Sequence, residues 1–210
     1  MVATCFTTDP EQWRQAGIVI PSELERAMPR RIAEFMAGRR CAQEALLLLT
    51  GRSEAPARGV DRAPLWPKGV VGSITHCGLH ALALAGHAHE YLGLGIDLER
   101  LLERREAHTV APLIMTGGEQ RRWGHAAESF LVTLVFCAKE SLFKALYPLV
   151  RRTFYFDAAE LLDWDPQGRA RLRLCTDLGE RWVAGTVLEV RHCLFKGHLL
   201  TRVSLPQVDR

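Results

Sequence analysis

The sequence lacks closely spaced cysteines, because its six cysteines are scattered along the chain. Structural zinc sites need Cys or His ligands a few residues apart, and no such spacing occurs here. Several of the cysteines lie in apolar runs, where a free thiol behaves as a small hydrophobic side chain. We therefore expect neither a zinc site nor a disulfide framework, and we place the protein in a reducing compartment. The cysteines are Cys5, Cys41, Cys77, Cys137, Cys175 and Cys193.

A long apolar run is also absent from the sequence. No segment has the length and the hydrophobicity of a membrane-spanning helix. The first ten residues have neither a basic start nor an apolar stretch, so we expect no secretory signal there. These absences predict a cytoplasmic protein without a membrane partner.

The chain has neither a strong charge of one sign nor a glycine-rich phosphate loop. A net charge of +3 is too small to indicate a protein that binds nucleic acid. No Walker or dinucleotide-binding loop is present. Ser129 and Ser141 have no triad-like neighbours, which argues against nucleophilic catalysis. His76 and His80 are four residues apart, but no third ligand follows them, so zinc is disfavoured.

The first half of the chain predicts one long helix and three short strands. Ser22 begins a capping-box pattern for a short first helix, which Pro29 interrupts. Apolar residues then recur at helical spacing over 30–49. The stretch 52–69 is rich in Gly, Pro and charge, which is typical of a loop. Strands are expected at 70–76, 81–85 and 92–98.

The second half repeats this order of a helix followed by strands. The charged stretch 100–108 is our candidate hinge between the halves, and Thr116 with Glu119 forms another capping box. A long helix is expected over 128–147, ending at Pro148. Strands are expected at 154–156, 159–164, 169–175, 187–195 and 198–205, with a hairpin around Lys196-Gly197. The sequence therefore predicts an α+β fold.

Two carboxylates lie at the end of the strand 92–98. Side chains two apart on a strand share one face, so Asp97 and Glu99 point the same way. Mg²⁺ prefers a few carboxylates together with waters and substrate phosphates, and this pair is suited to it. The alternative is an ordinary acidic strand end that faces water.

A glutamate and a lysine share one face of the second long helix. Glu140 and Lys144 are four residues apart, which by itself indicates a surface salt bridge. Apolar Phe136, Phe143 and Tyr147 on the same side would reduce the access of water. A partly desolvated glutamate can act as a base, and a lysine can neutralise charge on a leaving phosphate. We therefore expect three carboxylates and a lysine to meet at one site.

Further residues are suited to phosphate binding. Ser73, Thr75 and His76 are expected in a turn after a strand, where hydroxyls, backbone N–H groups and an imidazole can contact phosphate oxygens. Arg31 and Arg39 lie on approximately one side of the first long helix. The alternatives are a hydrogen-bonded turn and a solvated basic helix face.

Five short segments together resemble a known family. In order and spacing they resemble the 4′-phosphopantetheinyl transferases of the surfactin type, and within these the branch of enterobactin synthase component D. The segments are Gly38-Arg39, Ala63-Pro64-Leu65-Trp66-Pro67, Gly72-Ser73-Ile74-Thr75-His76, Gly95-Ile96-Asp97-Leu98-Glu99 and Lys139-Glu140-Ser141-Leu142-Phe143-Lys144-Ala145.

The resemblance implies roles for the acidic residues and the lysines. Asp97, Glu99 and Glu140 would hold a divalent metal on the diphosphate of coenzyme A, with Mg²⁺ expected and Mn²⁺ possible. The implied catalytic residues are Asp97, Glu140 and Lys144. Glu140 would activate the acceptor, directly or through water, and Lys144 would neutralise the diphosphate and protonate the leaving group. Lys139 would be a further phosphate contact.

The resemblance also implies where coenzyme A binds. His76 would be a phosphate contact, and Arg31 and Arg39 would hold the 3′-phosphate and adenine end. A basic residue before the Trp-Pro pair usually helps, and here Arg58 is our choice ahead of Arg62. The fold would consist of two halves related by a pseudo-twofold axis, 1–103 and 104–210, with the active-site cleft between them.

The implied reaction moves phosphopantetheine from coenzyme A to a serine of an apo carrier protein. Carriers of fatty-acid, polyketide, siderophore and peptide synthesis all remain open. Two halves in one chain can complete one site, so we expect a monomer, and we expect no nucleic-acid partner. The alternatives are another Mg²⁺-dependent enzyme that cleaves a phosphoanhydride, and a non-catalytic protein that binds coenzyme A or the carrier.

Overall fold

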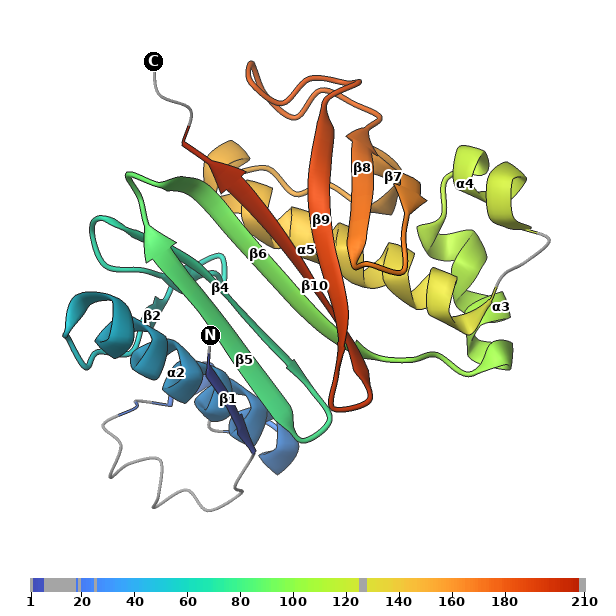
Figure 1. Ribbon diagram of the computed structural model, residues 1–210. Helices are drawn as coiled ribbons and strands as arrows, with labels where there is room; N and C mark the ends of the chain where they lie inside the picture. Colours follow the sequence, from blue (N-terminus) through green and yellow to red (C-terminus); the bar gives the residue numbers. More distant parts are fainter. Residues whose placement is uncertain (1, 6–17, 19, 25, 125–127, 208–210) are drawn as a thin grey trace. The chain divides into compact units, whose positions relative to one another are not determined.

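The computed structural model describes residues 2–5, 18, 20–24, 26–124 and 128–207. The chain forms two compact units, one of residues 1–94 with 206–210, and the other of residues 95–205 (Figure 1). Each unit has a long helix and an antiparallel sheet, as the predicted α+β class requires. The boundary falls inside a strand, whereas we predicted it after residue 103. The pseudo-twofold relation and the cleft stay predictions.

The first unit is organised by helix α2 (Pro29–Thr50). Pro29 begins this helix instead of interrupting one, because proline has no N–H to lose at the first helical position. Gly51 ends it in the left-handed conformation, with its N–H bonded to the carbonyl of Leu47. The predicted span 30–49 is therefore confirmed. The short helix predicted from Ser22 is a 3-10 turn, η1 (Ser22–Leu24).

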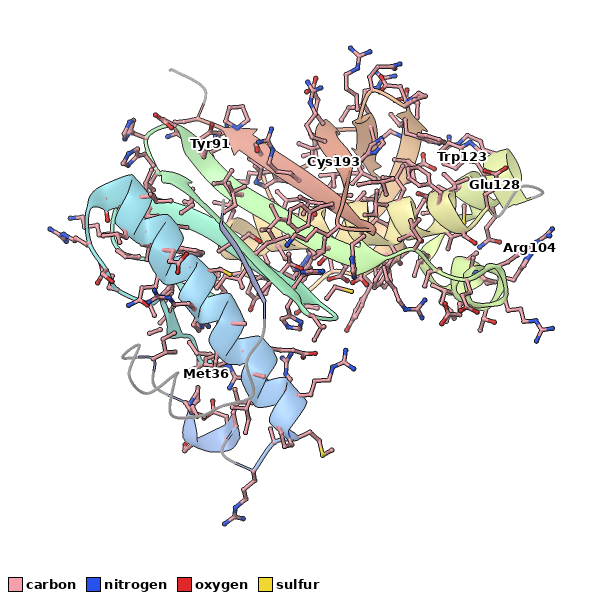
Figure 2. All side chains as sticks on the ribbon, turned by 60° about the horizontal axis from the view of Figure 1, so that its bottom comes forward. Met36, Tyr91, Arg104, Trp123, Glu128 and Cys193 are labelled. Atoms are coloured by element: carbon pink, nitrogen blue, oxygen red, sulfur yellow. The ribbon has the colours of Figure 1, made fainter. Side chains whose placement is uncertain are left out.

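Helix α2 packs on a three-stranded antiparallel sheet in the order β1-β5-β4. The strands are β1 (Val2–Cys5), β4 (Val70–Cys77) and β5 (His80–His87). Fully buried Met36, labelled in Figure 2, lies in the core of this unit. A Cβ on Gly38 would come within 2.8 Å of the Ile74 side chain, so glycine allows the close approach of helix and sheet. The predicted loop holds two short strands, β2 (Ala57–Arg58) and β3 (Pro64–Leu65).

The second unit contains a five-stranded antiparallel sheet in the order β6-β10-β9-β8-β7. Its strands are β6 (Tyr91–Arg100), β7 (Ala159–Trp164), β8 (Arg169–Leu174), β9 (Val187–Phe195) and β10 (His198–Pro206). The β9–β10 hairpin turns at Lys196 and Gly197, both with positive φ, as predicted. Of the five strands predicted for this half of the chain, the one at 154–156 is not a strand in the structure. It leads into a 3-10 turn, η3 (Phe156–Ala158).

Helix α5 (Ser129–Val150) contacts β6 at Gly95 and β10 at Thr201. The hydroxyls of Ser141 and Thr201 are 2.6 Å apart, and Thr201 Oγ1 donates to the carbonyl of Cys137 at 2.8 Å. These three buried residues form a hydrogen-bonded group inside an otherwise apolar interface. The helix continues past Pro148, which we expected to end it, because a proline in the last turn removes only one backbone hydrogen bond.

Two shorter helices precede α5, α3 (Arg104–Ile114) and α4 (Gly117–Trp123), and Figure 2 labels one residue of each. The stretch 100–108, our candidate hinge, contains the start of α3, where Glu103 and Glu106 form a capping box. Its role as a hinge stays a prediction. The capping box predicted for Thr116 and Glu119 is confirmed. No helix of the described residues combines the length and the apolar character needed to span a bilayer.

Candidate active site

A glycine brings the acidic strand and the helix of the predicted site together. Gly95 on β6 faces α5, and a Cβ at this position would overlap the carbonyl oxygen of Ser141. It would also come within 2.8 Å of the backbone nitrogen of Ala145. The helix backbone therefore lies directly on the strand. This contact places Asp97 beside Lys144, within the second unit.

The lysine and the first aspartate form a short ion pair. Lys144 Nζ lies 2.6 Å from Asp97 Oδ1 and donates to the carbonyl of Ile96 at 3.1 Å. Asp97 is 4% exposed, so this pair lies at the buried edge of the site. The sequence predicted that Glu140 and Lys144 share a helix face. The hydrogen bonds of the lysine ammonium show that it reaches across to the strand.

The three carboxylates act on one another electrostatically. The pKa of Glu99 is raised to about 7, mainly by burial and then by the negative charges of Asp97 and Glu140. The positive charge of Lys144 lowers this pKa and offsets part of the increase. Burial and the charge of Asp97 also raise the pKa of Glu140. Burial alone would lower the pKa of Lys144, but the charge and hydrogen bond of Asp97 reverse this and raise it. Negative charge is thus concentrated around one lysine.

These groups suit a hard divalent cation in their chemistry but are not arranged as a finished coordination shell. All the donors are carboxylate oxygens, which Mg²⁺ and Mn²⁺ prefer, and a cation would relieve their mutual repulsion. Within the described ranges, no three His, Cys, Asp or Glu side chains are already placed as the ligands of one ion. The metal role of Asp97, Glu99 and Glu140 stays a prediction.

The raised pKa of Glu99 gives a pH-dependent stability. The folded pKa, about 7, lies above the ordinary value of 4.5, so between these values the folded state binds more protons than the unfolded state. Stability should therefore fall as pH rises from about 4.5 to 7. We expect Glu99→Gln to have a higher melting temperature than the wild type at pH 8 in the absence of divalent metal. The difference should shrink towards pH 5. Melting curves of both proteins across this range test the assignment, and a constant difference would contradict it.

A buried arginine in the first unit has an unsatisfied donor. Arg39 on α2 is 5% exposed, and its Nη1 has no hydrogen-bond partner. Burial, followed by the charge of Arg58, lowers the pKa of Arg39 to about 10. Arg58 on β2 is held by Glu23, with 2.6 Å between Nη1 and Oε1. Two neighbouring cations with an orphaned buried donor form a favourable place for an anion.

Arg31 and His76 meet near the start of α2. Arg31 Nη1 lies 3.1 Å from His76 Nε2, and Glu34 Oε2 lies 3.7 Å from the other ring nitrogen. Ser73 and Thr75 are not in a turn, because β4 continues to Cys77. Strand alternation places their buried hydroxyls on the face opposite His76. The structure therefore brings Arg31 to His76. The phosphate contacts of Ser73 and Thr75 stay predictions.

The ammonium of Lys139 is held by acceptors that lie outside its own helix α5. Lys139 is 4% exposed, and its ammonium donates to Glu119 Oε2 and to the carbonyl of Ile114, both at 2.7 Å. A third bond reaches the carbonyl of Phe156 at 2.8 Å. Three protein acceptors therefore surround Nζ. The phosphate contact expected for Lys139 stays a prediction.

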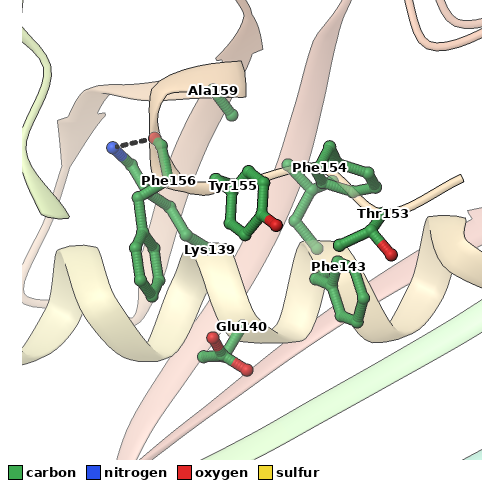
Figure 3. A pocket seen from close by; sticks show the side chains of 9 residues that line it. Lys139, Glu140, Phe143, Thr153, Phe154, Tyr155, Phe156 and Ala159 are labelled. Atoms are coloured by element: carbon green, nitrogen blue, oxygen red, sulfur yellow. Dashed lines mark hydrogen bonds between the residues drawn. The ribbon is translucent and has the colours of Figure 1, made fainter.

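A cavity of about 200 Å³ lies beside Glu140, between α5 and the segment 153–156 (Figure 3). Its walls are mostly apolar and aromatic. The ring of Phe143, predicted to limit water access, lies tilted against that of Phe154, with 5.1 Å between the ring centroids. The sequence did not predict this wall of the cavity, because the three consecutive aromatic residues 154–156 are typical of a strand. The lining is completed by Lys139, Leu142, Thr153, Tyr155, Phe156 and Ala159.

Comparison with protein families matches both units. The N-terminal domain of 4′-phosphopantetheinyl transferases matches residues 20–86. The 4′-phosphopantetheinyl transferase superfamily matches residues 93–201, which is more than half of the chain. The chain belongs to this superfamily. The match covers β6 from residue 93 onward and all of α5, and so it includes the carboxylate group and Lys144 described above.

Curated members of the superfamily are similar to the chain over part of their lengths. The 4′-phosphopantetheinyl transferase Npt of Nocardia iowensis is 33% identical, over 66% of this chain and 62% of its own. The transferase Svp of Streptomyces mobaraensis is 39% identical, over 74% and 65%. Enterobactin synthase component D of Escherichia coli K12 is 39% identical, over 59% of each chain. The aligned part thus spans about six tenths of these relatives.

Among solved structures, the chain resembles the holo-[acyl-carrier-protein] synthase of Thermotoga maritima. The TM-score is 0.44 at 21% identity, over 56% of this chain and 65% of that one. A likeness at this level does not bear on the function of this chain.

Proposed function

We propose that this protein transfers 4′-phosphopantetheine from coenzyme A to a serine of an apo carrier protein and releases adenosine 3′,5′-bisphosphate. Membership of the superfamily supports the reaction type. The observation that carries the proposal is the short Asp97–Lys144 pair, whose aspartate charge, after burial, raises the pKa of both Glu99 and Glu140. A cation and several carboxylates at one point are what a reaction at a diphosphate needs.

The residues of the second unit would divide the chemistry between them. Asp97, Glu99 and Glu140 would hold the divalent metal, and the metal would supply charge neutralisation at the diphosphate. Glu140, whose pKa is raised by burial, would accept the proton of the carrier serine. Lys144 would balance the charge that develops on the leaving phosphate. The serine oxygen then forms a bond to phosphorus while the bond to the leaving oxygen breaks, an in-line displacement that depends mainly on positioning.

The residues of the first unit would hold the adenosine end of coenzyme A. The orphaned donor of Arg39 and the charge of its neighbour Arg58 support binding of a phosphate by this pair. Arg31 with His76 would contact a second phosphate group. Ser73 and Thr75 stay predicted contacts. The aromatic cavity beside Glu140 has the polarity to take the uncharged pantetheine arm.

Incubation with coenzyme A, Mg²⁺ and a panel of apo carrier proteins tests the proposal. The panel should include carriers of siderophore synthesis, since some relatives are named enterobactin synthase component D, and carriers of fatty-acid synthesis. Mass spectrometry of each carrier should show the added mass of one phosphopantetheine group. Cleavage of coenzyme A without an acceptor would favour a hydrolase. Binding without any turnover would favour a non-catalytic protein.

Replacement of the buried arginine should weaken binding of the 3′-phosphate. We expect Arg39→Met to bind coenzyme A about 10- to 100-fold less tightly, the loss that one charge-assisted contact of ~1.5–3 kcal/mol represents. Dephospho-coenzyme A, which lacks this phosphate, should bind both proteins alike. Isothermal titration calorimetry measures both. Arg40→Met is the matched control, because Arg40 pairs with Glu44 and is 39% exposed. Equal losses for the two ligands would contradict the assignment.

We further propose that the protein acts as a monomer in the cytoplasm, with Mg²⁺ or Mn²⁺ as its metal. For docking of an acidic carrier, the basic end of α4 offers Arg121, Arg122 and Trp123. Arg122 instead donates to Glu160 and to the carbonyl of Leu161, so its guanidinium is held by the second unit itself. Exposed Arg121 remains available to a partner.

A further inference from the structure

A fully buried carboxylate joins three elements of the second unit. Glu119, on α4, is 0% exposed. One carboxylate oxygen accepts the N–H of Leu161 on β7, and the other accepts the N–H of Thr116 at 2.7 Å. The second oxygen also lies 2.7 Å from Lys139 Nζ on α5. A capping box alone needs only the bond to Thr116, so the other two contacts require a separate explanation.

Lys139 extends this group to the wall of the aromatic cavity. Its ammonium donates to the carbonyl of Phe156, where the segment 153–156 meets η3, as Figure 3 shows. The ring of Phe156 also contacts α5, because its centroid lies 5.5 Å from that of Phe136 on this helix. Lys139 is adjacent to Glu140 in sequence, and both line the cavity. One buried ion pair therefore holds the segment that lines this cavity together with Glu140.

We propose that Glu119 and Lys139 are a positioning pair that shapes the cavity for the pantetheine arm of coenzyme A. This inference rests on the proposed function. The pair contacts neither the diphosphate nor the acceptor. It acts by holding the segment 153–156 against α5, so that the arm passes between Glu140 and the aromatic wall. The fit of the arm, and not the hold on the adenosine end, depends on it.

A buried ion pair is a poor choice for stability alone, because desolvation offsets much of its attraction. An apolar pair of similar size would pack at least as well. Such a pair would, however, leave the carbonyls of Ile114 and Phe156 without their donor. The directional bonds of Lys139 are therefore the part of the arrangement that an apolar substitute would not reproduce.

The double variant Glu119→Gln/Lys139→Met removes the charges together and so leaves no unpaired buried ion. We expect it to melt within a few degrees of the wild type and to bind coenzyme A about tenfold less tightly, equivalent to about one lost contact of ~1.4 kcal/mol. Its affinity for adenosine 3′,5′-bisphosphate, which lacks the arm, should stay within about twofold of the wild type. A purely structural pair would change both affinities alike, and that result, or two unchanged affinities, would overturn the proposal.

A matched control and a second measurement complete the test. Asp163→Asn/Arg171→Met removes an exposed ion pair between β7 and β8 and should change neither affinity. If Glu119→Gln/Lys139→Met does not fold, hydrogen exchange of the wild-type protein tests the proposal instead. Coenzyme A should slow exchange in 153–156 more than adenosine 3′,5′-bisphosphate does, and equal protection would overturn the proposal. A wild type that binds coenzyme A but transfers nothing would instead defeat the proposed function.

Discussion

Asp97→Asn should lower the rate of phosphopantetheine transfer by about 10²- to 10³-fold, the usual loss when one electrostatic contact to a reacting group is removed. Asn keeps the size of the side chain but removes the charge that holds Lys144 Nζ at 2.6 Å and that would hold the metal. Because the buried carboxylate raises the pKa of both Glu99 and Glu140, its loss should also return these values towards normal. The rate is measured by mass spectrometry of the carrier at limiting Mg²⁺.

The control for this variant is Asp163→Asn, which removes another carboxylate of the second unit. Asp163 pairs with Arg171 and its side chain is 50% exposed, so its loss should leave transfer within about twofold of the wild type, as for most surface pairs. If Asp97→Asn transferred at the wild-type rate at every Mg²⁺ concentration, the role of Asp97 in the site would be wrong.

Gly95→Ala should destabilise the second unit and abolish most of the activity. The added Cβ would overlap the carbonyl of Ser141, a backbone atom that moves only if α5 moves. Overpacking of this kind costs about 1–3 kcal/mol and sometimes more, and here we expect the upper end or beyond. A displaced helix would also separate Lys144 from Asp97. Urea denaturation and the transfer assay measure the two effects.

Gly179→Ala is the matched glycine substitution in the same unit. A Cβ at Gly179 would have nothing within 4 Å, so stability and transfer should both stay close to those of the wild type. If Gly95→Ala unfolded at the wild-type urea concentration, the close contact of β6 with α5 would not be required for the fold.

The elements that the sequence predicted best are those with local signals at their ends. Gly51 ends α2, and Lys196 with Gly197 forms the turn of the last hairpin. The errors arose where one residue type has two uses. Pro29 starts a helix that it was expected to break, because a proline is favourable in the first turn. The charged stretch around Glu103 was interpreted from its charge alone, and the capping box that its two glutamates form at the start of α3 was not predicted.

For the site, the sequence predicted the pairing of strand and helix but not every partner. Strand alternation and helical spacing were sufficient to expect Asp97 near Lys144. They did not indicate where Lys139 would point, because its acceptors come from α3, α4 and η3, which are distant in sequence. Ser73 and Thr75 were misplaced for a simpler reason. The strand predicted at 70–76 runs from Val70 to Cys77 without a break, so side chains that we had also expected in a turn follow the alternation of a sheet.

The hydrogen-bonded group of Cys137, Ser141 and Thr201 sets how helix α5 is rotated about its own axis. A helix that rests on a sheet through methyl groups alone can rotate by a fraction of a turn at little cost, since such contacts have no direction. Hydrogen bonds to β10 are directional, and they are satisfied at one rotation only. That rotation points Lys144, on the next turn of the helix, at Asp97. The buried hydroxyls of Ser141 and Thr201 thus fix the rotation of α5 at which Lys144 points towards Asp97.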